Sequence, residues 1–257
     1  ASIAHEIKNP LSGIKGAAQI LRGSARDSEA VECVNLILKE ADRLNLVLHS
    51  YLTMTRMPVF NQLNIHEVIE HALKVMGTVF QEKKISVEKS YDPSLPVILG
   101  DESKLLQVFI NLLKNAVEAM ETQKNLKRRP ALKNSGDKDL LSGRKASSRV
   151  LSISTRPSNE YMVIYEGEGH DRKAAKLKKQ RWVVITLQDT GAGIPGDELD
   201  RVFLPFYTRK EGGSGLGLAL SKKIIKDHGG IIKVKSKLGQ GTTISMYLPL
   251  QVTREGE

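Results

Sequence analysis

The sequence has very little cysteine and no long apolar run. Cys33 is the only cysteine in 257 residues, which excludes an internal disulfide framework and a zinc site built from several cysteines. No apolar stretch approaches the roughly 18 residues that a membrane-spanning helix needs, and no secretory leader opens the chain. We therefore expect no membrane span in this chain and a location in the cytoplasm.

Acidic residues are too few to balance the basic ones, and the imbalance is local. The chain has 39 Lys+Arg and 29 Asp+Glu, a net charge of +10. Residues 122–181 hold 16 basic and 6 acidic residues, so this segment carries the whole excess. Its tyrosines, Tyr161 and Tyr165, do not alternate with the cations as a base-stacking surface requires. We therefore favour a solvated insertion over a nucleic-acid-binding segment, and expect no direct nucleic-acid partner.

Apolar spacing over residues 1–56 predicts two helices separated by a break at residues 22–28. The second helix has a heptad seam. Two seamed helices joined by a tight turn cannot bury both stripes by themselves, so a second copy would complete a four-helix bundle. Two ordinary core helices of a monomer are the alternative. The apolar residues of the two stripes are Ile3, Ile7, Leu11, Ile14, Ala18 and Leu21, then Val34, Ile37, Ala41, Leu44, Leu48 and Tyr51.

The rest of the chain predicts an α+β sandwich, with helices on one mostly antiparallel sheet. Pro58 ends the helical part. We divide the chain into a helical hairpin at 1–58, a linker at 59–64 and a mixed domain at 65–257 that holds the basic insertion within 122–181. The predicted helices are 65–80, 102–121 (capped by Asp101) and 220–228, the strands 85–91, 150–155, 182–188, 231–236 and 242–248, and the loops or disordered stretches 122–148 and 167–181.

The first candidate site is His5-Glu6-Ile7-Lys8-Asn9-Pro10. His5 and Asn9 are one helical turn apart and lie away from the apolar stripe, with Glu6 beside them. An imidazole that faces away from the seam is open to a partner, and a neighbouring carboxylate can take its proton. This arrangement suits a nucleophile toward a phosphoryl group. An ordinary surface or capping histidine is the alternative.

A second candidate site lies on the long helix at 102–121. Asn111 and Asn115 are one turn apart and away from its apolar face. Asparagine is a mediocre helix former, and two amide oxygens at this spacing can meet a hard cation that also holds phosphates. Mg²⁺ suits such a site because it takes only one or two protein ligands. Two incidental surface amides are the alternative.

Two glycine-rich turns complete the set. In Asp189-Thr190-Gly191-Ala192-Gly193, a carboxylate at a strand end can accept a hydrogen bond from the exocyclic amine of adenine, although hairpins use the same residue types. Residues 212–218 open the last helix, where consecutive backbone N–H groups form a nest for phosphate. They match neither a dinucleotide-binding fingerprint nor a P-loop. The preceding residues 203–210 suggest a hinged lid or a well-packed loop.

In order and spacing, these motifs resemble the transmitter region of two-component sensor histidine kinases over essentially the whole chain. The counterparts of the H, N, G1, F and G2 boxes are residues 5–10, 111–119, 189–193, 203–206 and 213–217. In three stretches, residues 4–21, 91–96 and 212–220, the amino-acid sequence resembles that of the nitrogen-regulation sensor kinases of this family. The resemblance implies a helical-hairpin dimerisation domain, which forms a four-helix bundle as a dimer, followed by an α/β-sandwich ATP-binding domain of the GHKL (Bergerat) type.

The resemblance also implies a role for each matching residue. His5 would accept the γ-phosphoryl group of ATP with Glu6 as its base, and Asn9 would orient water in a phosphatase reaction. Asn115 would bind Mg²⁺ with help from Asn111. The other implied nucleotide contacts are Asp189, Gly191, Gly193 and Thr242 at the adenine, Gly213, Gly215 and Gly217 at the phosphates, and Arg209 or Lys210 at the γ-phosphate.

The implied partners are a second copy of the chain, a response regulator that acts as a nitrogen-regulation transcription activator, and a PII-type signal protein. A GHKL-type ATPase of the chaperone or DNA-topology kind is the alternative, and it would lack the helix pair with His5 and Asn9. A nucleotide-binding signalling scaffold without kinase activity is another. Because the chain starts four residues before His5, we expect an upstream segment to be missing. The basic region between the N and G1 boxes is also longer than the family pattern requires.

Overall fold

The computed structural model of the protein describes residues 2–24, 27–55, 57–128, 149–159, 161–163, 177–179, 181–210 and 213–250. By its internal contacts the chain divides into two units, one of residues 1–57 and 201–220 and one of residues 58–200 and 221–257. Within the described residues, no helix is long and apolar enough to cross a membrane.

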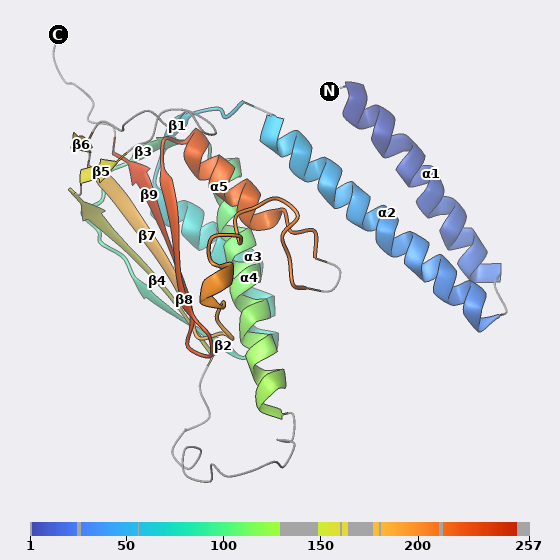
Figure 1. Cartoon of the computed structure of the whole chain (residues 1–257). Coiled ribbons are helices and arrows are strands. Elements are labelled where there is room, and N and C mark those ends of the chain that lie inside the picture. Colours follow the sequence, from blue (N-terminus) through green and yellow to red (C-terminus); the bar gives the residue numbers. More distant parts are fainter. Residues whose placement is uncertain are drawn as a thin grey trace. The chain divides into compact units, whose positions relative to one another are not determined.

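Two long helices pair in the first unit, as the apolar spacing predicted. Helix α1 covers Ser2–Ser24 and α2 covers Ser28–Thr55, and they pack side by side as a hairpin (Figure 1). The backbone N–H of Glu29 donates to Oδ1 of Asp27 over 3.4 Å at the start of α2, which is the role of a capping residue. Side chains of this pair are described for residues 11–23, 27–41 and 44, and the buried apolar ones among them are Leu11, Ala18, Val34 and Ala41.

A five-stranded sheet forms the centre of the second unit. Its strand order is β2-β4-β7-β9-β8. Strand β2 runs parallel to β4, and the other neighbouring pairs are antiparallel, which confirms the predicted mostly antiparallel sheet. The strands are β2 Ile85–Ser90, β4 Arg149–Ser158, β7 Trp182–Asp189, β8 Ile231–Lys237 and β9 Gly241–Pro249.

Helices cover one face of this sheet. Helix α3 (Ile65–Lys83), α4 (Glu102–Arg128) and the residues of α5 (Gly217–Asp227) that belong to this unit lie on the same side (Figure 1). Asn64 caps α3, because its Oδ1 accepts the His66 N–H over 3.0 Å. After α5, Gly229 has φ +69°, the left-handed geometry at which helices end. A 3₁₀ turn, η1 (Gly196–Glu198), follows the first glycine-rich loop.

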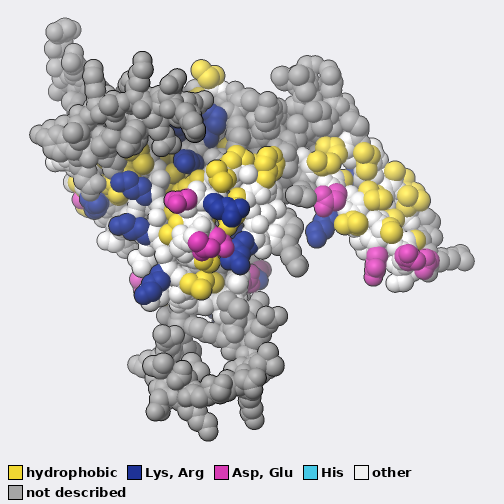
Figure 2. Space-filling model, viewed as in Figure 1, with side chains coloured by type: hydrophobic (Ala, Val, Ile, Leu, Met, Phe, Trp, Pro, Cys, Tyr) yellow, Lys and Arg dark blue, Asp and Glu magenta, His cyan; other side chains and the backbone are white. Residues whose placement is uncertain are grey.

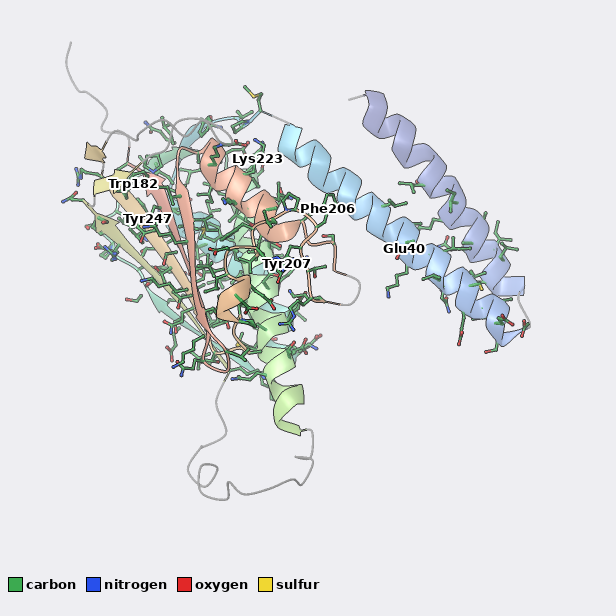
Figure 3. All side chains as sticks on the ribbon, viewed as in Figure 1. Glu40, Trp182, Phe206, Tyr207, Lys223 and Tyr247 are labelled. Carbon is green, nitrogen blue, oxygen red and sulfur yellow. The ribbon has the colours of Figure 1, made fainter. Side chains whose placement is uncertain are left out.

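The two faces of β7 have different neighbours, because successive side chains of a strand point to opposite faces. Asp189 contacts Gly191, which lies against Ala119 of α4, so the odd-numbered residues of β7 face the helices. Trp182 and Val184 lie on the opposite face, where they form a buried cluster with Tyr247. Figure 3 shows Trp182 and Tyr247 near one end of the sheet.

Three predicted segments differ from the structure. Residues 59–64, predicted to be a linker, contain β1 (Asn61–Leu63), which pairs antiparallel with β3 (Ile98–Gly100). Helix α4 continues past residue 121 to Arg128, since its added residues are mostly good helix formers. Residues 167–181, predicted to be a loop or disordered, contain β6 (Leu177–Lys179), which pairs with β5 (Tyr161–Val163).

The missed strands have three residues each, too few for an alternating pattern to predict them. Residues 129–148, 160, 164–176 and 180 of the basic insertion lie outside the described residues.

Candidate functional site

The phosphoryl-acceptor candidates lie on α1. His5, Glu6 and Asn9 all fall within Ser2–Ser24, so the predicted helical spacing is present in the backbone. Their side chains lie outside the described residues. The predicted orientation of this triplet away from the apolar stripe therefore stays a prediction.

Asn111 and Asn115 lie one turn apart on α4, next to a buried apolar face. Both are half-buried, so they are not the fully exposed surface amides that the sequence left as the alternative. The side-chain nitrogen of Asn111 donates to the hydroxyl oxygen of Ser221 on α5 over 2.9 Å. This bond fixes which end of the Asn111 amide faces α5, and leaves the amide oxygen pointing elsewhere. The buried residues of the apolar face are Leu105, Phe109, Leu112 and Ala116.

Asp189 is a buried acceptor at the end of β7. Its side chain is 8% exposed, and it lies opposite Thr242 of the neighbouring strand β9. Oδ1 accepts the backbone N–H of Gly191 over 2.8 Å and that of Thr242 over 3.3 Å. Among the described residues, both donors meet the same oxygen, so Oδ2 is the oxygen left to receive a donor from a ligand. A neutral amine such as that of adenine fits this requirement.

Burial also changes the acidity of Asp189. Loss of solvent raises the pKa of its carboxyl group to about 6, although the N–H groups of Gly191 and Thr242 act in the opposite direction. A carboxylate that is both buried and shifted toward neutrality is typical of functional sites. At pH 7 and above it is ionised and accepts hydrogen bonds.

The loop after Asp189 contacts α4 and the β8–β9 turn region. The N–H of Ala192 donates to the Ala119 carbonyl oxygen of α4 over 3.0 Å, and the Ala192 carbonyl oxygen accepts the N–H of Gly239 over 2.7 Å. Gly193 has φ +72°, and a Cβ there would collide with the Lys237 carbonyl oxygen. The structure thus brings Asp189, Gly191, Gly193 and Thr242 together, and their contact with adenine stays a prediction.

Ser236 is a site residue that sequence reasoning missed. Its hydroxyl accepts the N–H of Ile194 over 2.8 Å, donates to the Gly241 carbonyl oxygen over 2.8 Å, and lies 2.9 Å from the hydroxyl of Thr242. It therefore joins the loop to the strand that carries Thr242. A serine in an alternating strand gives no signal of this role, and Ser221 gave none either.

Gly241 is expected to tolerate no side chain. It has φ +103°, and a Cβ there would collide with the carbonyl oxygen of Asp189. We expect Gly241→Ala to lower the free energy of unfolding by about 3 kcal/mol, from left-handed backbone strain and overpacking. Urea unfolding measures this. Gly239→Ala is the matched control, since Gly239 has φ +76° with nothing within 4 Å, and an equal loss in both variants would contradict the prediction.

Residues 201–210, which contain the predicted lid, and residues 213–216 lie against each other in the first unit. Gly215 has φ +66°, and a Cβ there would collide with the backbone of Phe206, which itself has φ +65°. Leu204 and Phe206 are 52% and 62% exposed, and the guanidinium of Arg201 lies 4.8 Å from the ring centroid of Tyr207. Figure 3 shows Phe206 and Tyr207 on this loop.

The remaining phosphate candidates lie in the same segment. Arg209 and Lys210 are exposed, and the carbonyl oxygen of Lys210 accepts the Gly213 N–H over 3.1 Å. Gly217 is the first residue of α5, so the glycine-rich stretch opens a helix as predicted.

Two domain families match the chain. Residues 1–58 match the His Kinase A (phospho-acceptor) domain, and residues 157–252 match the histidine kinase-, DNA gyrase B- and HSP90-like ATPase. Among solved structures, full-length ShkA in complex with AMPPNP is similar with a TM-score of 0.62 and 21% identity, over 98% of this chain and 46% of that one. The histidine kinase ThkA in complex with the response regulator TrrA has a TM-score of 0.58 and 21% identity, over 99% and 62%.

Curated relatives match in sequence. The sensory histidine kinase/phosphatase NtrB of Rhizobium leguminosarum bv. phaseoli is 37% identical over 255 residues, which are 97% of this chain and 57% of that protein. NtrB of Rhodobacter capsulatus is 38% identical over 250 residues, 96% of this chain and 60% of that protein. The chain thus spans little more than half the length of these relatives. The chain belongs to the sensor histidine kinase family, and carries its phospho-acceptor domain and its ATPase domain.

Proposed function

We propose that the chain phosphorylates itself on His5 with ATP and passes the phosphoryl group to an aspartate of a response regulator. The observation that carries the proposal is the buried acceptor Asp189 within the ATPase-family match, in a chain whose phospho-acceptor match spans His5. Adenine recognition by Asp189 and a histidine nucleophile are the two functions that such a kinase needs. Gly213, Gly215 and Gly217 would supply backbone N–H groups for the phosphates.

The chemistry is two successive phosphoryl transfers. A ring nitrogen of His5 attacks the γ-phosphorus of ATP, so a P–N bond forms while the bond to the oxygen of ADP breaks, and Glu6 takes the ring proton. An aspartate oxygen of the regulator then attacks the same phosphorus. This step breaks the P–N bond and forms an acyl phosphate, while the proton held by Glu6 returns to the ring and restores neutral histidine.

Mg²⁺ is the proposed metal. Amide and phosphate oxygens are ligands that it accepts, and the half-buried Asn115 would hold it with Asn111 nearby. Within the described part of the chain, no three acidic, histidine or cysteine side chains gather as a metal site, so the cation would depend on these amide oxygens and on the nucleotide. When bound, it would neutralise phosphate charge.

The names of the relatives suggest two finer proposals. NtrB proteins are named as kinase and phosphatase, and Asn9, one turn after His5, would orient the water that hydrolyses the phosphorylated regulator. The same names suggest a regulator in nitrogen control. Control by a PII-type signal protein and a cytoplasmic location stay predictions from the sequence.

The homodimer is proposed from the half-buried seam of the helix pair. Leu11, Ala18, Val34 and Ala41 are buried. The seam residues that alternate with them are 43% to 55% exposed, and Figure 2 shows hydrophobic side chains along this hairpin. A second copy would cover this surface and complete a four-helix bundle. The exposed seam residues are Ile14, Leu21, Ile37 and Leu44.

A charge on the exposed seam is expected to separate the dimer. Leu44 is 51% exposed, so Leu44→Glu costs little in a monomer but would bury a charge in the dimer. We expect the dimer dissociation constant to rise at least about a hundredfold, from about 3 kcal/mol, as measured by analytical ultracentrifugation. Asn35→Glu is the matched control, because Asn35 is exposed on another face of α2. A monomeric wild type, or equal association of both variants, would refute this interface.

The phosphotransfer test uses γ-³²P-ATP, the chain and candidate response regulators of the source organism. We expect acid-labile label on the chain within minutes and its movement to one regulator on mixing. A chain that hydrolyses ATP without becoming labelled would favour the alternative GHKL-type ATPase. A chain that binds ATP without hydrolysis or labelling would favour the signalling scaffold.

A further inference from the structure

A buried polar bond joins α5 to α4 near the start of α5. Ser221 is 1% exposed, and its hydroxyl oxygen accepts a hydrogen bond from the side-chain nitrogen of Asn111 over 2.9 Å. Ser221 is one turn after Gly217, the first residue of α5. A hydroxyl without its partner at this depth would cost more than an exposed one, so this bond favours one alignment of the two helices.

A second buried polar bond joins the far end of α5 to the start of α4. The backbone N–H of Asp101 donates to Nε2 of His228 over 2.9 Å, and Nδ1 of His228 lies 2.7 Å from the Ile224 carbonyl oxygen. Because the first partner is a donor and the second an acceptor, the imidazole is neutral with its proton on Nδ1. Burial lowers the pKa of His228 in agreement, while Asp101 and Asp227 act to raise it and Lys104 to lower it.

Asp101 is itself tightly held. Its Oδ1 accepts the Lys104 N–H over 3.1 Å at the first turn of α4, and its Oδ2 accepts the Val59 N–H over 3.0 Å. The ring of Phe60 meets the His228 ring edge-on, with centroids 5.1 Å apart. His228 is therefore attached to a capped, rigid helix start.

His228 directly follows α5, so the two bonds are seven residues apart, about 10 Å along the helix axis. Sliding or rotating α5 on α4 by one residue would break both and leave buried donors and acceptors unpaired. Ile224 and Ile225 of α5 are also buried, but apolar burial is non-directional and does not fix an alignment so strictly.

We propose that Ser221 and His228 are positioning residues that fix the alignment of α5 on α4, and that Ser221 thereby orients the Asn111 amide for the phosphates of a nucleotide. This rests on the proposed function, since it assumes that Asn111 and Asn115 hold the phosphates of ATP with Mg²⁺. Both residues lie outside the proposed adenine contacts, which are Asp189, Gly191, Gly193 and Thr242. Their loss therefore weakens the binding of a triphosphate while sparing that of a monophosphate.

Equilibrium binding of ATP with Mg²⁺ and of AMP to the full chain tests this. We expect Ser221→Ala to weaken ATP binding about tenfold and to leave AMP binding unchanged, since AMP lacks the β- and γ-phosphates. Ser221→Thr keeps the hydroxyl and is expected to restore the ATP-to-AMP affinity ratio. Thr186→Ala, which removes a half-buried hydroxyl 3.4 Å from that of Ser245, is the matched control with an unchanged ratio.

His228 gives an independent pair of variants. His228→Gln places an amide oxygen near the position of Nε2 and can accept the Asp101 N–H, whereas the shorter His228→Asn can replace only Nδ1. We expect the ratio to be kept by glutamine and lowered by asparagine. This pair also decides the matter if Ser221→Ala fails to fold, as judged by thermal unfolding.

The outcomes separate the two proposals. A wild-type chain that binds neither nucleotide refutes the proposed function. A wild type that binds both, with the same ratio in Ser221→Ala or an equal loss of ATP and AMP, overturns the positioning role alone.

Discussion

Replacing His5 with glutamine is expected to abolish the acid-labile label that γ-³²P-ATP leaves on the chain. Glutamine keeps a polar side chain of similar size but has no nucleophilic ring nitrogen, so no P–N bond can form. We expect less than about 1% of the wild-type rate, because the nucleophile itself is lost. Filter binding after acid and alkali treatment measures the label and identifies it as phosphohistidine.

His5→Gln is expected to lose phosphorylation without losing ATP binding. ATP affinity of His5→Gln is expected to equal that of wild type, because His5 belongs to the phospho-acceptor match and the nucleotide is held by other residues. His71→Gln is the matched control, since His71 is exposed on α3, and it should be labelled normally. Label that persists in His5→Gln would place the acceptor elsewhere and refute the assignment.

Replacing Asp189 with asparagine is expected to weaken ATP binding about a hundredfold without weakening the fold. The amide oxygen can still accept the N–H groups of Gly191 and Thr242, which puts the amide nitrogen where Oδ2 lies. That nitrogen would meet the adenine amine donor to donor, at a cost of about 3 kcal/mol. Isothermal titration calorimetry measures the affinity.

The free energy of unfolding of Asp189→Asn shows whether any loss of ATP binding comes from a damaged fold. Because the folded-state pKa of Asp189 is raised from 3.8 to about 6, the ionised carboxyl disfavours the folded state above pH 6. That cost disappears as pH falls through 6 toward 3.8, and amounts to about 3 kcal/mol. Asp189→Asn removes it, so we expect the variant to be at least as stable as wild type at pH 7.5.

Protonation of Asp189 is expected to weaken ATP binding, although the same protonation stabilises the fold. The ionised carboxylate accepts the backbone N–H groups at Oδ1 and can accept from adenine at Oδ2, whereas a protonated carboxyl group has lost one of these acceptors. We therefore expect ATP affinity to be constant above pH 7 and to fall below about pH 6. Asp197→Asn, at an exposed acid of η1, should bind like wild type. An Asp189→Asn variant that binds ATP normally, or that unfolds at pH 7.5, would contradict this role for Asp189.

Local patterns were enough for the long elements. The three-and-four spacing of Leu11 to Ala18 and of Val34 to Ala41 predicted α1 and α2, and alternation predicted β4 and β7. These patterns work because one buried face repeats along each element. The short strands β1 and β6 have no such repeat, and they exist through pairing with residues distant in sequence.

Some residues of the candidate site were also identified by local patterns, and others only by the tertiary structure. Glycines and an aspartate at a strand end identified the turn at Asp189 from the sequence, because the backbone geometry of such a turn restricts its residue types. The family resemblance alone pointed to Thr242, and no local pattern did, since Thr242 reaches Asp189 only through the pairing of β7 with β9. Ser236 joined the site for the same reason.

By itself, the sequence determined the order of helices and strands, the family boxes and the uneven distribution of charge, all of which are properties of neighbouring residues. Tertiary structure alone decided which half of the helical seam is buried, and which of the two Asp189 oxygens receives the backbone donors. It also decided that Ser221 and His228 bond to Asn111 and Asp101. The physical reason is that a polar side chain can pair with many partners, and only packing of distant segments selects one.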